Sequence, residues 1–171
     1  MEVFEGKAWI SGQGLIDTCI GVEEGKITAV KKILKGDKQT VVDGIILPSA
    51  LDMHVHFRDP GYPNKEDWKS GSESAACGGV TAVVDMPNTN PPTSNMTEFQ
   101  RKLDLAKNRM YCNYAFYFGA TADNARDLAS LKDLEGCCGI KLFAGSSTGN
   151  LLVAEEDDIE KVFQNLSIIH I

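Results

Sequence analysis

The first 48 residues carry short hydrophobic runs that are separated by polar turns. β-branched and aromatic residues recur in these runs, and the turns between them contain glycine, as at Ser11–Gly14 and Glu24–Lys26. Such a pattern is typical of β-strands joined by tight turns. It predicts a small β-subdomain over residues 1–48. The predicted strands are 3–10, 15–22, 27–30, 41–42 and 45–47.

From residue 49 onward, strand-like hydrophobic runs alternate with helix-like ones. Successive strand-like runs start about 30 residues apart, which is the length of one strand–helix unit. A series of such units favours an α/β fold with a parallel sheet. Either a TIM-like (β/α)8 barrel or an open, doubly wound sheet fits the pattern. The strand-like runs start near Leu51, Val80, Cys112, Gly139 and Ile168, and the helix-like runs cover 66–76, 98–110, 124–131 and 155–166.

Two of the predicted helices have signals at their N-terminal ends. The segment Thr97-Glu98-Phe99-Gln100 has the form of a capping box, so we expect the second helix to begin beside Thr97. The acidic residues Glu155–Asp158 open the last helix, where they suit the positive end of the helix dipole.

The length of the chain limits how much of a barrel it can form. A complete (β/α)8 barrel typically needs about 250 residues. The chain has 171 residues, and its fifth strand-like run begins only near Ile168. We therefore expect residues 49–171 to be the first half of a barrel, truncated at strand five, and the chain to be the front part of a longer protein.

Composition narrows the class of protein. The net charge of −7 argues against a nucleic-acid-binding surface. No run is long and apolar enough to span a membrane, and the N-terminus lacks a signal-peptide pattern, so we expect a cytoplasmic protein with neither nucleic acid nor membrane as partner. The five cysteines have no regular spacing and are expected to be reduced thiols. Trp9 and Trp68 are interpreted as packing residues.

The chain contains only three histidines: His54, His56 and His170. His54 and His56 are two residues apart at the end of a hydrophobic run, and alternate residues of a strand point to the same face. This spacing would present two imidazole nitrogens to one cation. The pair therefore predicts a metal site at the end of the first barrel strand.

Lys141 interrupts the hydrophobic run at residues 139–143. A lysine inside such a strand must be paired or neutralised, because burial of a bare ammonium group is costly. An ion pair with a neighbouring acid would satisfy it, and so would a side chain that reaches past the strand end to water. A third alternative is a neutral amine that takes up carbon dioxide as a carbamate, which could bridge two cations.

The candidate residues follow several predicted strands at the same end. Active sites of parallel barrels lie at the C-terminal ends of the strands, so these side chains would converge on one mouth. Arg58 could bind a carboxylate with its planar fork, and Asn88 could donate a hydrogen bond to the same group. A surface ion pair for Arg58 and a turn for Asn88 are the structural alternatives. Asp52 and Asp85 could orient an imidazole, or form purely structural hydrogen bonds.

Three motifs, in this order, resemble those of dihydroorotases in the amidohydrolase superfamily. They are HVHFRDPG at 54–61, GGVTAVVDMPNTNPPT at 78–93 and GIKLFAGSSTGNLL at 139–152. The combination of HxHxR with MPNT favours dihydroorotase over hydantoinase. Allantoinase is closer to the pattern than hydantoinase but usually differs at the asparagine. The β-rich N-terminus also resembles the part of a composite β-sandwich that this family contains.

The resemblance implies a TIM-like barrel of the amidohydrolase type with two zinc ions. By this resemblance, His54 and His56 would bind one ion, carbamylated Lys141 would bridge both ions, and His170 would bind the second. Paired ions of this kind polarise a carbonyl and lower the pKa of a bound water, which suits amide hydrolysis.

The resemblance also implies a substrate. Arg58 and Asn88 would hold the carboxylate of L-dihydroorotate, which the enzyme would interconvert reversibly with N-carbamoyl-L-aspartate in de novo pyrimidine biosynthesis. The catalytic aspartate of the family, a general base, is expected beyond residue 171, as is a further metal-binding histidine. We therefore expect the 171 residues alone to be inactive.

Two other functions stay open at this point. One is a non-catalytic, dihydroorotase-like scaffold or partner protein, and the other is an allantoinase-type cyclic amidase. The chain departs from the family pattern at Ser49, where a glycine usually follows the proline, and at Ile171. An open half-barrel exposes a strand edge and apolar surface, so we expect a homo-oligomer or association through that edge.

Overall fold

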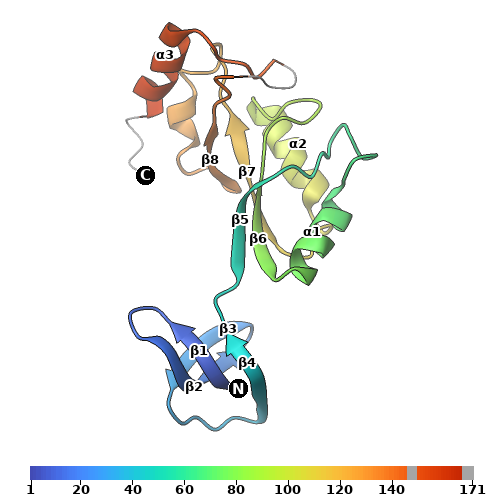
Figure 1. The fold of residues 1–171 in the computed structure, drawn as a ribbon. Coiled ribbons are helices and arrows are strands. Elements are labelled where there is room, and N and C mark those ends of the chain that lie inside the picture. Colours follow the sequence, from blue (N-terminus) through green and yellow to red (C-terminus); the bar gives the residue numbers. More distant parts are fainter. Residues whose placement is uncertain (146–149, 167–171) are drawn as a thin grey trace. The chain divides into compact units, whose positions relative to one another are not determined.

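The computed structural model describes residues 1–145 and 150–166. The chain divides into two compact units, Met1–Ser49 and Ala50–Ile171 (Figure 1). The first unit consists of β-strands, and the second contains a parallel sheet with helices. No helix among the described residues is long and apolar enough to cross a membrane.

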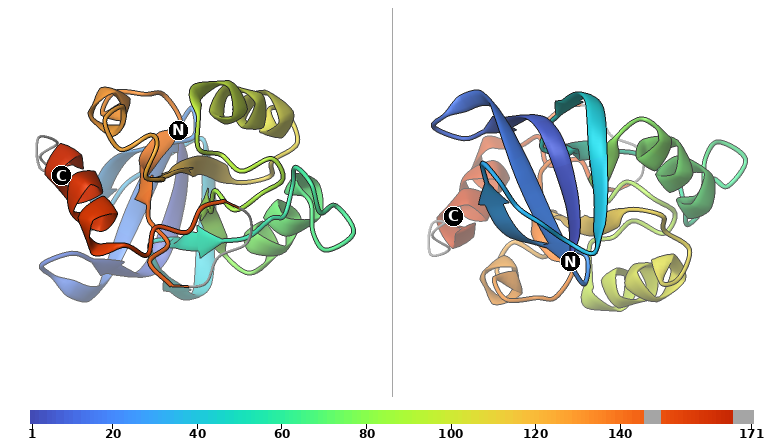
Figure 2. Two further views of the ribbon diagram at one scale, coloured as in Figure 1. Left: turned by 90° about the horizontal axis from the view of Figure 1, so that it is seen from above. Right: turned by 90° about the horizontal axis from the view of Figure 1, so that it is seen from below.

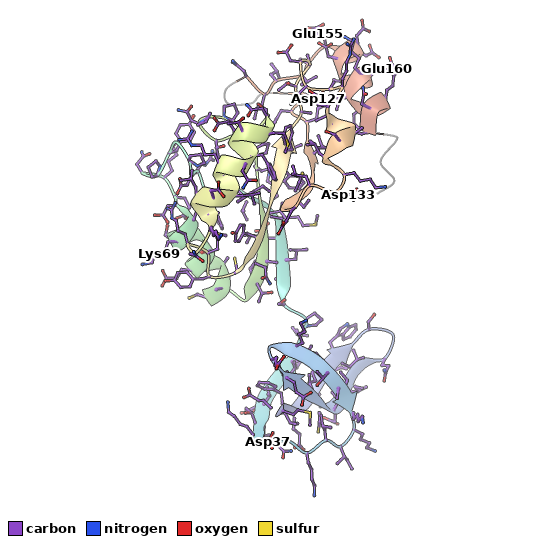
Figure 3. The ribbon with its side chains drawn as sticks, turned by 180° about the vertical axis from the view of Figure 1, so that it is seen from behind. Asp37, Lys69, Asp127, Asp133, Glu155 and Glu160 are labelled. Atoms are coloured by element: carbon purple, nitrogen blue, oxygen red, sulfur yellow. The ribbon has the colours of Figure 1, made fainter. Side chains whose placement is uncertain are left out.

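The first unit is a four-stranded mixed sheet in the order β3-β2-β1-β4. Strands β1, β2 and β3 are joined as antiparallel hairpins, whereas β4 runs parallel to β1. Glu24 and Gly25, between β2 and β3, both have positive φ (49° and 75°), which a two-residue type I′ hairpin turn requires. The Met1 amino group donates to Asp37, labelled in Figure 3, at 2.8 Å. The strands are β1 (Glu2–Ile10), β2 (Gly14–Glu23), β3 (Lys26–Lys31) and β4 (Lys38–Ile46).

Strand β4 corrects the prediction of two short strands at 41–42 and 45–47. The structure has one continuous strand, Lys38–Ile46, and the interruption in its hydrophobic pattern at Asp43 and Gly44 is absorbed by a register shift against β1. Gly44 has φ 139°, a backbone conformation that side chains disfavour. The polar break therefore marks an irregularity within a strand and not a turn between strands.

The second unit contains a parallel sheet in the order β5-β6-β7-β8. Its four strands coincide with the first four strand-like runs of the α/β pattern, so that part of the prediction is confirmed. The predicted fifth strand near Ile168 lies outside the described residues. The strands are β5 (Ala50–Val55), β6 (Val80–Asp85), β7 (Asn113–Gly119) and β8 (Cys137–Lys141).

Three α-helices accompany this sheet: α1 (Trp68–Cys77), α2 (Met96–Ala106) and α3 (Glu156–Leu166). The first turn of α3 is acidic, as predicted. Helix α2 begins earlier than the predicted capping box at Thr97, because the side chain of Asn95 is the cap. Its Oδ1 accepts a hydrogen bond from the Glu98 backbone N–H at 2.9 Å.

The predicted helix at 124–131 is wrong. Only a 3-10 turn, η1 (Leu128–Leu131), forms there. The side chain of Asn124 donates to the backbone carbonyls of Ser94 and Gly119 and accepts from the Thr121 N–H. Bonds of this kind compete with helix formation, so the segment packs as a loop.

The helices cover one face of the sheet (Figure 2). Trp68 of α1 and Phe99 of α2 pack on Phe116 of β7, with ring centroids 5.3 and 6.3 Å apart respectively. Since strand residues alternate between faces, the neighbours of these core-facing residues project to the opposite face. The buried core members are Phe57, Trp68, Val83, Phe99, Ala106, Phe116, Phe118, Ala120, Ala125, Leu128, Leu131 and Val162.

Candidate metal and substrate site

His54 and His56 lie at the C-terminal end of β5. Val55 packs against the helix-covered core, so alternation directs the flanking imidazoles to the other face of the sheet. The two ring centroids are 5.3 Å apart. The rings thus lie side by side, as the spacing predicts, and could offer two nitrogens to one cation.

Asn88, in the loop after β6, fixes the hydrogen-bonding state of His56. Its Oδ1 lies 2.9 Å from His56 Nδ1. With the amide oxygen toward the ring, Nδ1–H is the donor of this hydrogen bond, and in that tautomer Nε2 has the lone pair that a metal requires. A ligand in this arrangement has its tautomer set by the hydrogen bond at its other nitrogen.

The surroundings of His56 also favour its neutral form. Burial lowers the pKa of the imidazole, and the positive charge of Arg58 lowers it further, whereas the hydrogen bond that His56 makes to Asn88 and the charge of Asp85 act in the opposite direction. A histidine must be deprotonated at the ligating nitrogen to bind a metal. The environment of His56 therefore suits a metal ligand.

Asp52 and Asp85 support the backbone and not the imidazoles. Asp52 Oδ1 accepts a hydrogen bond from the His54 backbone N–H at 3.0 Å. Asp85 Oδ1 accepts one from the Phe57 backbone N–H at 2.7 Å. These contacts favour the alternative in which the two aspartates form structural hydrogen bonds to the backbone.

Arg58 lies outside strand β5, so strand alternation does not set the direction of its side chain. Strand β5 ends at Val55, and Arg58 has φ 63°, in the left-handed region. Its carbonyl accepts a hydrogen bond from the Tyr62 N–H at 2.8 Å, so the residue opens a turn. Among the described residues its guanidinium forms no ion pair, which disfavours the surface-ion-pair alternative in this part of the chain.

A groove of about 600 Å³ runs along β5 beside α1. His56 and Arg58 lie at one end, and Gly78 and Val80 lie at the other. The groove follows an open strand edge for most of its length. Only its His56 end belongs to the candidate site.

Lys141 is the last residue of β8. Ile140 packs against the core, so Lys141 projects to the same face of the sheet as His54. Its Nζ lies 5.1 Å from the centroid of the Phe143 ring, a cation–π contact. No acid within the described residues pairs with it.

The strands that carry the candidate ligands are at opposite edges of the four-stranded sheet. Three strand spacings of about 4.8 Å separate β5 from β8 by about 14 Å along the sheet. Long side chains can meet over such a span only on the concave face of a curved sheet. Residues 1–145 and 150–166 contain no group of three His, Cys, Asp or Glu side chains that could hold a metal. His170, a predicted ligand, lies outside them.

Cys137 and Cys138, at the start of β8, allow a test of the environment of that strand. Burial, together with the neighbouring Cys137, raises the pKa of the Cys138 thiol to about 11. At pH 8 only about one thiol in a thousand would then be ionised, and the thiolate is the reactive form. Both Cys77 and Cys138 have exposed side chains, so the raised pKa of Cys138 is the difference tested, and we expect iodoacetamide to label Cys138 at least ~10-fold more slowly than Cys77, as followed by mass spectrometry. Equal rates in the folded chain would contradict the expectation, and in urea the two rates should converge.

The sequence analysis missed a buried charge next to the site. Lys102 of α2 is 1% exposed, and its Nζ lies 2.6 Å from Asp85 Oδ2 and 2.9 Å from the Met86 carbonyl oxygen. The signal was available, because Phe99, Lys102 and Ala106 occupy helical spacings that place all three on one buried face.

Comparison with known proteins agrees with the motifs. A model of the family described as "Dihydro-orotase-like" matches residues 43–144. A dihydroorotase of Methanosarcina mazei is 39% identical over 140 residues, which is 80% of this chain and 30% of that protein. A dihydroorotase of Pyrococcus abyssi is 36% identical over 170 residues, or 97% of this chain and 40% of that protein. The chain thus spans well under half the length of these curated relatives.

A solved structure extends the likeness to the fold. L-Hydantoinase (dihydropyrimidinase) from Arthrobacter aurescens is 26% identical, with a TM-score of 0.85, over 97% of this chain and 38% of that one. This match confirms the prediction of the first part of an amidohydrolase-type, TIM-like barrel and excludes the open, doubly wound alternative. Because the family model covers more than half of the chain, the chain belongs to the dihydroorotase-like family of cyclic amidohydrolases.

Proposed function

We propose that this chain is the front part of a zinc-dependent dihydroorotase, which interconverts L-dihydroorotate and N-carbamoyl-L-aspartate in de novo pyrimidine biosynthesis. The observation that carries the proposal is the state of His56. Its Nδ1 is engaged by Asn88 at 2.9 Å, its pKa is lowered by burial, and the His54 ring lies beside it at 5.3 Å. Such a pair is prepared to bind a divalent ion.

The proposed ligand set includes two residues beyond this pair. His54 and His56 would hold one zinc ion, Lys141, as a carbamate, would bridge two ions, and His170 would hold the second. The position of Lys141 on the same face of the sheet as His54 supports this set. When bound, zinc supplies a Lewis acid for the amide carbonyl and lowers the pKa of a water molecule.

Arg58 and Asn88 are proposed to hold the substrate carboxylate. Arg58 lines the groove beside His56, and its charge is close enough to lower the pKa of that imidazole. A guanidinium suits a planar carboxylate, which it can bind with two parallel hydrogen bonds. The chain is acidic overall, so an anionic substrate needs a local cation of this kind.

The exposed apolar residues support two further parts of the proposal. Trp9, Val41 and Ile45 of the first unit are more than half exposed, as expected for one layer of a composite β-sandwich. Leu51 and Met53 of β5 are also more than half exposed, which supports association through an open barrel edge. The cytoplasmic location and the pathway rest on the sequence and on family membership.

The test is made with the protein produced from its whole gene. Zinc content is measured for the wild type, for His54→Ala with His56→Ala, for Lys141→Ala, and for Lys132→Ala as a control at an exposed lysine. We expect the first two variants to lose at least one zinc ion per chain and all detectable dihydroorotate hydrolysis, because each removes ligands of the proposed centre. The control should match the wild type.

Substrate choice is tested in the same preparations. L-Dihydroorotate, allantoin and hydantoin are compared by kcat/KM. We expect dihydroorotate to be preferred, in line with the higher identity to dihydroorotases than to the hydantoinase. Preference for allantoin or hydantoin would replace the proposed substrate. Unchanged zinc content in both ligand variants would refute the metal centre, and a zinc-free wild type without turnover would favour the scaffold function.

A further inference from the structure

Lys102 occupies an unusual position for a charged residue. It lies on the buried face of α2, between Phe99 and Ala106, and is 1% exposed. Burial of an ammonium group costs several kcal/mol unless partners compensate for the lost water. A hydrophobic residue would fill the same space without this cost. The arrangement of its partners is therefore informative.

Three kinds of contact surround the ammonium group. Asp85 Oδ2 lies 2.6 Å from Nζ, and the Met86 carbonyl oxygen accepts a hydrogen bond from Nζ at 2.9 Å. The rings of Phe116 and Trp68 lie around the same atom, with centroids at 4.8 and 5.6 Å. The ammonium thus donates to the Met86 carbonyl and forms an ion pair with the Asp85 carboxylate, and aromatic rings lie around the rest.

Asp85 extends the contact to the strand that carries the histidines. It is 1% exposed, and its second oxygen, Oδ1, accepts a hydrogen bond from the Phe57 backbone N–H at 2.7 Å. Phe57 directly follows His56 in the chain. A hydrogen bond to the backbone here limits the rotation of the peptide that joins His56 to Phe57.

Met86 extends the contact to the loop that carries Asn88. Its N–H donates to the Val55 carbonyl at 3.0 Å, and its carbonyl accepts from Lys102. Asn88 follows two residues later. One buried ammonium group therefore fixes both backbone segments whose side chains form the His56–Asn88 hydrogen bond.

We propose that Lys102 and Asp85 are positioning residues, a buried ion pair that holds the segments of His56 and Asn88 in register so that His56 Nε2 is directed toward the metal. The inference rests on the proposed metal role of His56. Neither residue touches the metal or the substrate. A buried pair of this kind rarely adds net stability over a hydrophobic pair, but its directional bonds specify one arrangement of the groups around it.

The test compares three variants of the whole protein. Lys102→Met keeps the unbranched stem and removes the charge. Asp85→Asn combined with Lys102→Met removes both charges, keeps an oxygen for the Phe57 N–H, and avoids an unpaired buried carboxylate. Arg101→Met is the matched control, because Arg101 lies on the same helix, is 55% exposed and forms only a surface ion pair with Glu98.

Two readouts are used, and thermal unfolding identifies the variants that fold. Nitrogen-15 NMR of the metal-free protein reports which nitrogen of His56 carries the proton, and titration with Zn²⁺ gives the dissociation constant. We expect the neutral double variant to fold, to lose the single Nδ1–H form of His56, and to bind Zn²⁺ about 10- to 100-fold more weakly. Arg101→Met should match the wild type in both readouts.

The outcomes separate this inference from the proposed function. A folded double variant with the wild-type tautomer and wild-type zinc affinity would overturn the positioning role, even if zinc binding itself stands. A changed tautomer in the metal-free double variant supports the role independently of metal. Failure of the proposed function would instead appear as equal zinc contents in the wild type and in the variant that lacks His54 and His56.

Discussion

Replacement of Trp68 by alanine is expected to lower the free energy of unfolding of the second unit by about 3–5 kcal/mol. Trp68 is fully buried, and its ring contacts Phe57 at 6.1 Å and Phe116 at 5.3 Å between centroids. It also encloses the Lys102 ammonium group. Alanine would leave a large cavity beside the ion pair of Lys102 with Asp85. Water entering this cavity would weaken the ion pair.

Denaturant unfolding followed by circular dichroism measures this effect. The control is Trp9→Ala, because Trp9 is 53% exposed and lies in the first unit. We expect the control to change the free energy of unfolding by less than ~1 kcal/mol. Similar losses in both variants would mean that Trp68 does not form the centre of the core. Tryptophan fluorescence is not used as the probe, because the chain has only these two tryptophans and each variant removes one of them.

The two tryptophans also show where sequence reasoning was effective. Both were interpreted as packing residues, which is confirmed for the fully buried Trp68, whereas Trp9 is 53% exposed within the described part of the chain. The strands β5 to β8 were placed correctly because buried parallel strands give hydrophobic runs at regular spacing. The helix at 124–131 was wrong because the Asn124 side chain bonds the nearby backbone at Gly119 and Thr121 and also the distant Ser94 carbonyl, and the hydrophobic pattern does not encode these bonds.

The candidate site was predictable only as far as the strand geometry extends. The side-by-side placement of His54 and His56 follows from alternation, and it is what the structure has. Arg58 lies beyond the strand end, where a left-handed residue breaks the alternation. The role of Asn88 as the partner of His56 depends on a contact across 32 positions of the sequence. Lys102 was missed because its helical position was assessed without regard to burial.

Gly61 lies where two loops of the candidate site approach each other. It has φ 108°, a conformation that side chains disfavour, and a Cβ placed on it would lie 2.5 Å from Asn90 Cβ and 2.6 Å from the Asn90 carbonyl oxygen. The Asn90 N–H also donates to the Pro60 carbonyl at 3.0 Å. The loop after β5 and the loop that carries Asn88 therefore contact each other backbone to backbone. Only glycine permits this approach.

Gly61→Ala is expected to lower the free energy of unfolding by about 2–4 kcal/mol, since it adds a steric clash with backbone atoms to the cost of the strained φ. The matched control is Gly79→Ala, in the same unit, where φ is 82° and a Cβ would meet nothing within 4 Å. That variant carries backbone strain without a clash and should lose about 1 kcal/mol. Denaturant unfolding of both variants separates the cost of the steric clash from the cost of the strained φ.

Zinc titration then connects the loop contact to function. If the clash separates the two loops, the His56–Asn88 hydrogen bond lengthens, and Gly61→Ala should bind Zn²⁺ more weakly while Gly79→Ala binds as the wild type does. The comparison is decisive because both variants change one glycine with positive φ. Equal zinc affinities in a folded Gly61→Ala variant would show that the ligand geometry does not depend on the approach of these loops, and that His54 and His56 are held by their own strand alone.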